Sequence, residues 1–199
     1  MKKIVVVGAS GVLGGAVAAG LDKDHEVIRA SRKGADLSLD ASNSEQLNAA
    51  FKKVGPIDGL VVCIGHVPFE PFETVDLDAF SAGIMNKFMH QANLVRAALP
   101  HLKDNASVVL TSGILADEPL IGSSCAAAAN GALHSFVMAV SAELAGRIRI
   151  NVVSPSVVEA SVEGFGDFFD GFEATSMASL VKGYRRCLAG PISGRVLKI

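Results

Sequence analysis

Three glycines near the start of the chain have the spacing and setting of a phosphate-binding loop. The stretch VVVGASGVLGG places Gly8, Gly11 and Gly14 after a β-branched block and at the opening of a helical block of small residues. Glycine permits the tight turn, and its missing Cβ lets a pyrophosphate approach the backbone. The amino end of the helix adds unpaired N–H donors and a favourable dipole. This setting predicts a dinucleotide site, the alternative being glycines needed only for helix–strand packing. The other loop residues expected at the nucleotide are Ser10, Val12 and Leu13.

A group of cations further along the chain indicates which nicotinamide nucleotide is bound. The second expected strand ends in VIRASRKG, which contains Arg29, Ser31, Arg32 and Lys33 but no acid. An NAD site places Asp or Glu there for the ribose, whereas a 2′-phosphate prefers a guanidinium and a hydroxyl. Ser31 and Arg32 therefore favour NADP(H) over NAD(H), unless these cations merely solvate a loop end.

Apolar, β-rich blocks alternate with longer helical blocks, and these elements must position the candidate residues. The expected strands are Lys3–Ala9, Glu26–Ser31, Ala35–Leu39, Ile57–Gly65, Ser107–Gly113, Ile148–Pro155 and Gly194–Ile199. The expected helices are Gly11–Asp22, Ser44–Val54, Leu77–Leu102, Gly122–Ala145 and Ser176–Leu188. The alternation predicts a single α/β domain over residues 1–199. We expect a doubly wound Rossmann fold with about seven parallel strands and helices on both faces.

The composition excludes some partners. Half of the 199 residues are apolar and the formal net charge is −2, which gives no reason to expect nucleic acid or an anionic membrane. Three separate cysteines without a CxxC pair indicate free thiols in a reducing cytoplasm. The first twenty residues share the outline of a secretory signal peptide, but glycines and a β-branched block interrupt the apolar run. We expect no other segment to be long and apolar enough to span a membrane.

Several motifs make the chain resemble the short-chain dehydrogenase/reductase family over essentially its whole length. GASGVLG resembles the family's dinucleotide loop, although its G-x-x-G-x-x-G spacing departs from the commonest form. LDAS resembles an element that would put Asp40 near the adenine, and VVCIG keeps Gly65 of the N-N-A-G motif. VVLTSG resembles the strand that ends in the catalytic serine, here Ser112. INVVSP resembles the N-x-V-x-P-G strand, which implies Pro155 at the cofactor and leaves Ser156 where glycine is usual.

The family's proton donor, a tyrosine in Tyr-x-x-x-Lys, is absent. Alignment on NGALHSF puts Ala126 and Asn130 at the two places, whereas the usual spacing from the serine puts Cys125 and Ala129 there. The one tyrosine of the chain, Tyr184, has no lysine four residues later. The pattern resembles a subgroup that keeps the nucleotide fold without the usual active-site residues.

Ser112 and Lys87 are the residues that we expect to carry any remaining catalysis. The place of the family's helix asparagine falls on Lys87, with Asn86 adjacent. The Lys87 amine could stabilise a developing alkoxide, and Ser112 could donate a hydrogen bond to the same oxygen. The alternative for Lys87 is a solvated or interface lysine.

Other titratable residues have simpler explanations. Cys125 is better explained as a small buried hydrophobe and Glu159 as a solvated loop acid, while His66 follows the fourth expected strand at the ligand-binding edge. The remaining histidines have no ligand spacing and predict no metal site: His25, His90, His101 and His134. In the loop 156–173, the run EGFGDFFDGF predicts either a substrate lid or a plug of the core.

Two functions of different classes remain open on this sequence. The first is an NADP(H)-dependent oxidoreductase of the short-chain type, acting on a small carbonyl or alcohol with a rearranged proton donor. The second is a non-catalytic NADP(H)-binding sensor or scaffold. The resemblance also implies a homo-oligomer through the long helices Leu77–Leu102 and Gly122–Ala145.

Overall fold

A seven-stranded parallel sheet forms the centre of the protein, in a computed structural model that describes all residues from Met1 to Ile199. The strand order is β3-β2-β1-β4-β5-β6-β7. The strands are β1 (Lys3–Val7), β2 (Glu26–Ser31), β3 (Leu37–Ser38), β4 (Ile57–Val62), β5 (Leu102–Thr111), β6 (Arg149–Ser154) and β7 (Val196–Lys198). The order reverses between β1 and β4, so the crevice for a ligand lies at the carboxyl ends of these two strands. The predicted doubly wound Rossmann fold is confirmed.

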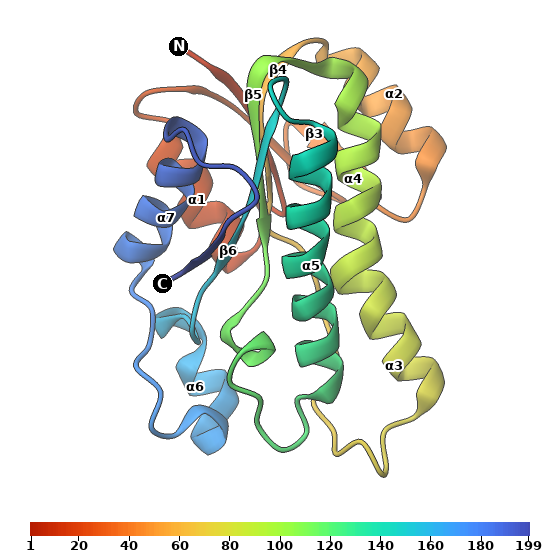
Figure 1. Ribbon diagram of the computed structural model, residues 1–199, viewed down its shortest axis with the longest axis vertical. Coiled ribbons are helices and arrows are strands. Elements are labelled where there is room, and N and C mark those ends of the chain that lie inside the picture. The colour runs from red at the N-terminus through yellow and green to blue at the C-terminus, as the bar shows by residue number, and fades with distance from the viewer.

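Helices cover both faces of the sheet (Figure 1). On one face, α1 (Val12–Leu21) and α7 (Met177–Ala189) pack over a cluster that includes Val6, Val109 and Tyr184. On the other face, α2 (Ser44–Val54), α4 (His90–Ala98) and α5 (Ser124–Glu143) cover a larger cluster around Leu60 and Leu110. Alternate residues of β5 enter the two clusters because successive strand side chains point to opposite faces.

The expected helix Leu77–Leu102 is interrupted. The structure has α3 (Leu77–Ile84), a π-helical segment at Met85–Met89, then α4, and a single 3₁₀ turn at Leu99–His101. Sequence periodicity did not reveal the π-helical segment, because one wide turn changes the register by a single residue. Such segments occur often at functional sites, and this one carries Asn86 and Lys87.

The connection from β6 to α7 is more regular than the sequence suggested. It contains a 3₁₀ turn at Glu159–Ser161, α6 (Val162–Phe165) and a second 3₁₀ turn at Gly166–Phe169. Edge-to-face aromatic contacts hold it together, among them Phe165–Phe169 and Phe168–Phe169. Phe69 reaches the same cluster from the loop after β4. We name the cluster formed by Phe69, Phe165, Phe168, Phe169 and Phe172 the phenylalanine cap.

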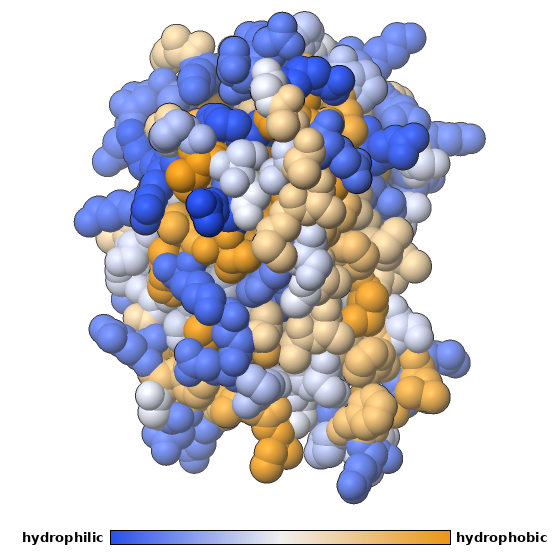
Figure 2. Space-filling model, viewed as in Figure 1, coloured by the Kyte–Doolittle hydropathy of each residue, from blue (hydrophilic) through white to orange (hydrophobic).

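Helix α5 corrects one expectation from the sequence. With 20 residues it is the one helix of the protein whose length and composition would allow a membrane span, whereas we expected none in this region. In the fold, Leu133 and Val137 of α5 are fully buried against the sheet, as in the core helix of a folded domain. Figure 2 shows a pale to orange surface over α5 and the neighbouring α4, whereas blue hydrophilic residues lie along the side of α1 and α7 and at both ends of the molecule.

Candidate functional site

Two adjoining cavities open at the carboxyl edge of the sheet. The larger, about 910 Å³, extends from the glycine loop over the end of β2, and we call it the nucleotide cavity after the ligand that the sequence predicts. The smaller, about 340 Å³, lies under the phenylalanine cap at the ends of β5 and β6, and we call it the reaction cavity after the chemistry that the sequence predicts. Both are lined by Gly11, Cys63, Ile64, Gly65 and His66, so they form one continuous cleft.

Glycine is needed at the three loop positions for different structural reasons. Gly8 has a φ of +87°, and a Cβ there would overlap the carbonyl group of Cys63. A Cβ at Gly14 would overlap the backbone of Gly8, so these two glycines serve the packing of helix on strand. Gly11 lines both cavities and is the N-cap of α1, with no side chain bonded to the free N–H groups of that helix. The packing alternative thus explains Gly8 and Gly14, and Gly11 is the glycine with a free approach for a phosphate.

Most of the expected cofactor residues lie in this cleft. The nucleotide cavity is lined by Gly8, Ser10, Gly11, Ser31, Arg32, Asp40 and Gly65. The reaction cavity is lined by Gly11, Val12, Leu13, Gly65 and Pro155, together with both expected catalytic residues, Ser112 and Lys87. Gly14 lines neither cavity, because it faces the backbone of Gly8.

The end of β2 presents an unpaired hydroxyl and free cations to the nucleotide cavity. The hydroxyl oxygen of Ser31 is buried without a hydrogen-bond partner, and the guanidinium of Arg32 forms neither a hydrogen bond nor an ion pair. Asp40 lines the same cavity, and two hydrogen bonds from Ser42 lower the pKa of its carboxyl below the usual value. Buried polar atoms are normally hydrogen-bonded, so a ligand atom near Ser31 would supply the partner that its hydroxyl lacks.

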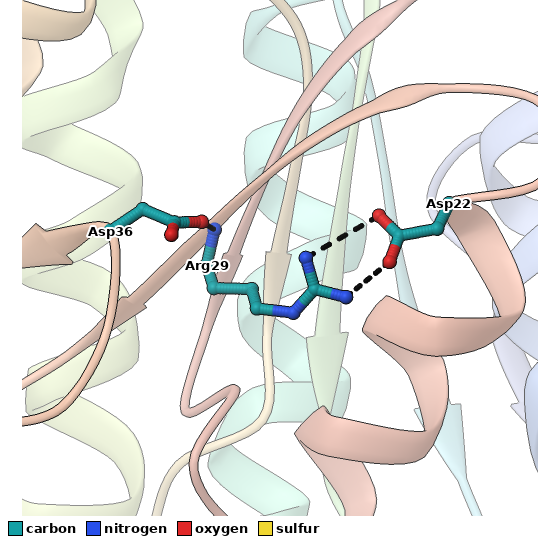
Figure 3. Close-up of polar contacts among 3 residues, drawn as sticks. All are labelled: Asp22, Arg29 and Asp36. Carbon is teal, nitrogen blue, oxygen red and sulfur yellow. Dashed lines mark hydrogen bonds and ion pairs between the residues drawn. The ribbon is translucent and has the colours of Figure 1, made fainter.

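Arg29, which the sequence grouped with these cations, belongs to a different surface. Its guanidinium pairs with Asp22 at the end of α1, and its backbone N–H donates to Asp36 (Figure 3). The side chain of Arg29 therefore serves a surface ion pair, and it does not line the nucleotide cavity.

Lys87 reaches into the reaction cavity from the π-helical segment. Its side chain packs over Gly65, where any Cβ would overlap the Lys87 stem, and its Nζ donates to the carbonyl oxygen of Ser112 at 3.4 Å. The stem is in part accessible from the cavity, whereas the amino group lies deep within the protein. Desolvation lowers the pKa of the Lys87 amine to about 8. The amine is thus mainly charged at neutral pH yet able to release its proton.

Gln91, which the sequence did not single out, fixes Lys87 relative to the strand ends. Its side chain is fully buried, and Nε2 donates to the carbonyl oxygens of Ile64, Lys87 and Thr111. Its Oε1 accepts the backbone N–H of Thr111. One amide thereby joins the π-helical segment to the ends of β4 and β5. A glutamine inside an amphipathic helix gives no sequence signal for such a role.

The structure distinguishes the two alignments of the missing tyrosine and lysine. Ala126 and Asn130 line the reaction cavity, and the Asn130 amide lies against Gly113. Cys125 points away from the cavity, its Sγ directed at the carbonyl oxygen of Phe80. The cavity wall therefore holds a methyl group and an amide at the two places, neither of which is an acid.

The Ser112 hydroxyl has a histidine partner that sequence reasoning dismissed. Ser112 lies directly after β5 on the side of the sheet covered by α5, and its Oγ is 2.9 Å from Nε2 of His134. His134 is half-buried, and burial lowers the pKa of its imidazole below the usual value. Nothing in the spacing of His134 from Ser112 indicates contact, because the two meet only when α5 packs on β5.

The sole tyrosine is not a substitute donor at the cavity. Tyr184 of α7 is fully buried, and its hydroxyl contacts Thr111 Oγ1 on the face of the sheet opposite α5. Desolvation raises the pKa of Tyr184 well above its usual value, which keeps it neutral. The Thr111 hydroxyl also donates to the carbonyl oxygen of Val62, so this pair joins α7 to β4 and β5.

The remaining candidate residues differ in whether they line a cavity. His66 lines both cavities, as its place after the fourth strand predicted. Glu159 lines neither and accepts the backbone N–H of Met177, which makes it a contact between the β6–α7 connection and α7. No group of three or more His, Cys, Asp or Glu side chains has the geometry to hold a metal ion. Phe69, Phe165 and Phe169 of the phenylalanine cap form the apolar wall of the reaction cavity.

The chain matches a family model over most of its length. The model is described as enoyl-(acyl carrier protein) reductase, and residues 8–183 match it. An uncharacterized oxidoreductase of Methylorubrum extorquens is 29% identical, the alignment covering 79% of this chain and 73% of that protein. A 1,2-dihydroxy-1,2-dihydronaphthalene dehydrogenase of a Ralstonia species is also 29% identical, over 73% of this chain and 57% of that protein. The chain thus aligns with little more than half the length of the latter.

Solved structures show the same architecture. The protein lin1944 from Listeria innocua superposes with a TM-score of 0.96 and 33% identity, with both chains fully covered. A small-chain dehydrogenase crystallised in complex with NADPH gives a TM-score of 0.88 at 22% identity, covering 100% of this chain and 96% of that one. Together with the family match and the carboxyl-edge cleft, these likenesses establish that the chain belongs to the short-chain dehydrogenase/reductase family, a family of oxidoreductases.

Proposed function

We propose that this protein is an NADP(H)-dependent oxidoreductase that acts on a small, largely apolar carbonyl compound or alcohol. The observation that carries the proposal is the continuous cleft in which a cationic nucleotide cavity opens into an apolar reaction cavity. A nicotinamide dinucleotide needs both cavities. Its phosphates need a cationic site, and its nicotinamide must lie beside the substrate.

The residues present fit the nucleotide. Gly11 and the N–H groups at the start of α1 would hold the pyrophosphate, and Asp40 would lie near the adenine. The unpaired Ser31 hydroxyl and the free Arg32 guanidinium would hold a ribose 2′-phosphate. When bound, the nicotinamide supplies the hydride donor or acceptor at the reaction cavity.

Two side chains supply electrostatic stabilisation at the reaction cavity. The charged amine of Lys87, held beside Ser112 by Gln91, stabilises negative charge on a substrate oxygen. The Ser112 hydroxyl forms a hydrogen bond with the same oxygen. The phenylalanine cap excludes water and favours an apolar substrate body in a space of about 340 Å³. The bicyclic diol in the name of the Ralstonia relative has this chemical character.

The altered wall of the reaction cavity supports a second candidate function. Ala126 and Asn130 provide no acid where the family has tyrosine and lysine. Loss of a general acid typically lowers the rate by about 10² to 10⁴. A protein that binds NADP(H) and reports or transmits its occupancy would keep the nucleotide cavity and tolerate this loss.

The experiment that tests the cofactor assignment compares two arginines of one strand end. We expect Arg32→Ala to weaken NADPH binding by roughly ten- to a hundredfold and NADH binding by less than about threefold, because only NADPH carries the 2′-phosphate. Arg29→Ala, which removes the pair with Asp22, is the matched control and should change neither affinity. Isothermal titration calorimetry measures all four values. Equal losses of NADPH and NADH in Arg32→Ala would contradict the preference for NADP(H).

A panel of small carbonyl compounds and alcohols, followed by NADPH absorbance, then separates the two candidate functions. Turnover in proportion to enzyme that is lost in Lys87→Met supports the oxidoreductase. Tight NADPH binding without turnover favours the non-catalytic protein.

The quaternary state and location complete the proposal. The apolar surface of α4 and α5 in Figure 2 suits a second copy of the chain, and Met138 of α5 is exposed. Small residues of α5 such as Ala128 would allow close helix approach. Analytical ultracentrifugation of Met138→Glu against the unchanged protein tests the interface, because a buried charge would shift a dimer towards monomer.

The three free thiols suit a reducing cytoplasm.

A further inference from the structure

We propose that Ser112 and His134 form a proton-transfer pair that takes the place of the missing tyrosine and lysine. In alcohol oxidation Ser112 removes the substrate's hydroxyl proton while Nε2 of His134 removes the proton of Ser112. Ser112 is the catalytic residue because it faces the reaction cavity, and His134 is a positioning residue that acts through it. The proposal rests on the oxidoreductase function proposed above.

The geometry of the pair carries the inference. The 2.9 Å contact between Ser112 Oγ and His134 Nε2 is within the range for proton transfer between a hydroxyl and its base. The other contact of the Ser112 hydroxyl, with the carbonyl oxygen of Val153, is at 3.5 Å, the limit of a hydrogen bond. Ala126, Asn130 and His134 follow one another at four-residue intervals along α5, so the basic ring lies two turns beyond the place of the lost tyrosine.

The surroundings of His134 keep a path to solvent. The imidazole is half-buried, so a proton that it accepts can be released to water without crossing the apolar cavity. Two charged groups face the ring, Asp117 from the segment after β5 and Lys198 from β7, and they form an ion pair with each other at 2.9 Å. Helix α5 itself places no charged side chain near His134.

The proton and electron balance of the step is complete. The substrate O–H bond breaks and its proton passes to Ser112 Oγ, whose own proton passes to His134 Nε2. The electron pair left on the substrate oxygen forms the carbonyl, and a bound nicotinamide would supply the acceptor for the hydride of the adjacent C–H bond. The imidazolium then loses the proton to water. Carbonyl reduction is the same sequence in reverse, with His134 as the source of the proton.

The charges of the site suit the oxidative direction at neutral pH. Burial lowers the pKa of His134 below the usual value of an imidazole, which favours the neutral ring, the form that accepts a proton. The pKa of Lys87 is about 8, so its amine is still charged at neutral pH and stabilises the alkoxide. Oxidation should therefore increase as pH rises through the pKa of His134 and decrease above about 8.

The first test needs no cofactor. We expect ¹⁵N NMR of histidine-labelled protein at pH 7.5 to show His134 as the Nδ1–H tautomer, with Nε2 accepting from Ser112. Ser112→Ala should shift the His134 Nε2 signal, whereas His101→Gln, at a histidine stacked on Phe51, should not. A His134 ring protonated on Nε2 at that pH cannot accept the Ser112 proton and would overturn the proposal.

The second test separates proton transfer from positioning. Glutamine at position 134 can keep a hydrogen bond to Ser112 but cannot take its proton. His134→Gln should lower kcat for alcohol oxidation by about a hundredfold and abolish the acid limb of the pH profile. Its NADPH affinity and substrate KM should stay within about threefold of the unchanged protein.

Each remaining outcome has one meaning. A His134→Gln variant that retains kcat and the acid limb overturns the proton-transfer pair. A protein that binds NADPH but turns over no alcohol or carbonyl compound overturns the pair and leaves cofactor binding intact. A protein that binds neither nicotinamide nucleotide refutes the proposed function itself.

Discussion

The two cavities of the cleft differ in what holds them together. The nucleotide cavity depends on backbone: the φ of Gly8, the approach of Gly14 to Gly8, and the free amino end of α1. The reaction cavity depends on side chains that meet from several elements, among them Lys87, Ser112 and His134. A backbone cradle changes only if the fold changes, whereas a side-chain site can be rebuilt residue by residue. The difference would allow a chain with the proposed function to keep the glycine loop while residues of the reaction cavity are replaced.

The largest effect is expected where backbone packing defines the nucleotide cavity. Gly14→Val places methyl groups against the Gly8 carbonyl, which is rigid backbone and cannot give way. We expect the free energy of unfolding to fall by about 3 kcal/mol or more, with NADPH binding lost. Urea denaturation and calorimetry measure the two effects. Gly164→Ala, at an exposed glycine with no atom near its absent Cβ, is the control. A stable Gly14→Val protein that binds NADPH would remove the contrast between the cavities.

The buried amine of Lys87 should lower the free energy of unfolding of the protein, and Lys87→Met tests this. The pKa of Lys87 is lowered to about 8 in the folded protein and is near 10.4 when unfolded, so the unfolded chain binds the additional proton between these values. The stability of the unchanged protein should therefore rise with pH from about 8 to 10.4, by on the order of 3 kcal/mol at most.

The methionine variant should lack this rise and be at least as stable as the unchanged protein at pH 7, while its turnover falls. Denaturation curves at pH 7 and pH 10 measure the difference. A parallel pH dependence in both proteins would show that the Lys87 amine is solvated, as in the alternative explanation of this lysine.

Phe169→Ala should affect the reaction cavity alone. Phe169 lines that cavity and packs edge-on against Phe165, Phe168 and Phe172. We expect the KM of an apolar substrate to rise by about tenfold, because hydrophobic contact is lost, with NADPH affinity unchanged. Phe72→Ala, at an exposed phenylalanine outside the cavity, is the matched control. An equal loss of NADPH affinity in Phe169→Ala would show that the two cavities are not independent.

The smallest effect is expected at the ion pair of Figure 3. Arg29 and Asp22 are both exposed by more than a third of their side chains, so solvent screens the pair. Arg29→Ala should change the free energy of unfolding by less than about 1 kcal/mol. A larger loss by urea denaturation would mean that this edge of the sheet supports the nucleotide cavity after all.

The sequence predicted the fold well because its signals are local. The strand Glu26–Ser31 and the helix Ser44–Val54 have the expected bounds, and every other expected strand is present with shorter or shifted ends. Strands buried on both faces and a glycine loop between strand and helix are patterns within a few consecutive residues. The π-helical segment at Met85–Met89 was missed because no local pattern distinguishes it from the α-helix that continues through it.

The candidate site was predicted only in part, for the same reason. Ser112 and Lys87 could be placed through the family's motifs, and Arg32 through the charge at the end of β2. His134 and Gln91 were missed, and Arg29 was grouped with a cavity that it does not line. Each of these three residues acts through a partner distant in sequence or on another face of the strand, which spacing does not show.

The sequence by itself determined the order of strands and helices, the nucleotide loop and the absence of Tyr-x-x-x-Lys, since each is a property of neighbouring residues. Tertiary structure alone decided that Lys87 lies in the cavity with a lowered pKa, that Ala126 and Asn130 form its wall, and that His134 meets Ser112. The physical reason is that desolvation and hydrogen bonding depend on which side chains the packing of helices on the sheet brings within a few ångströms.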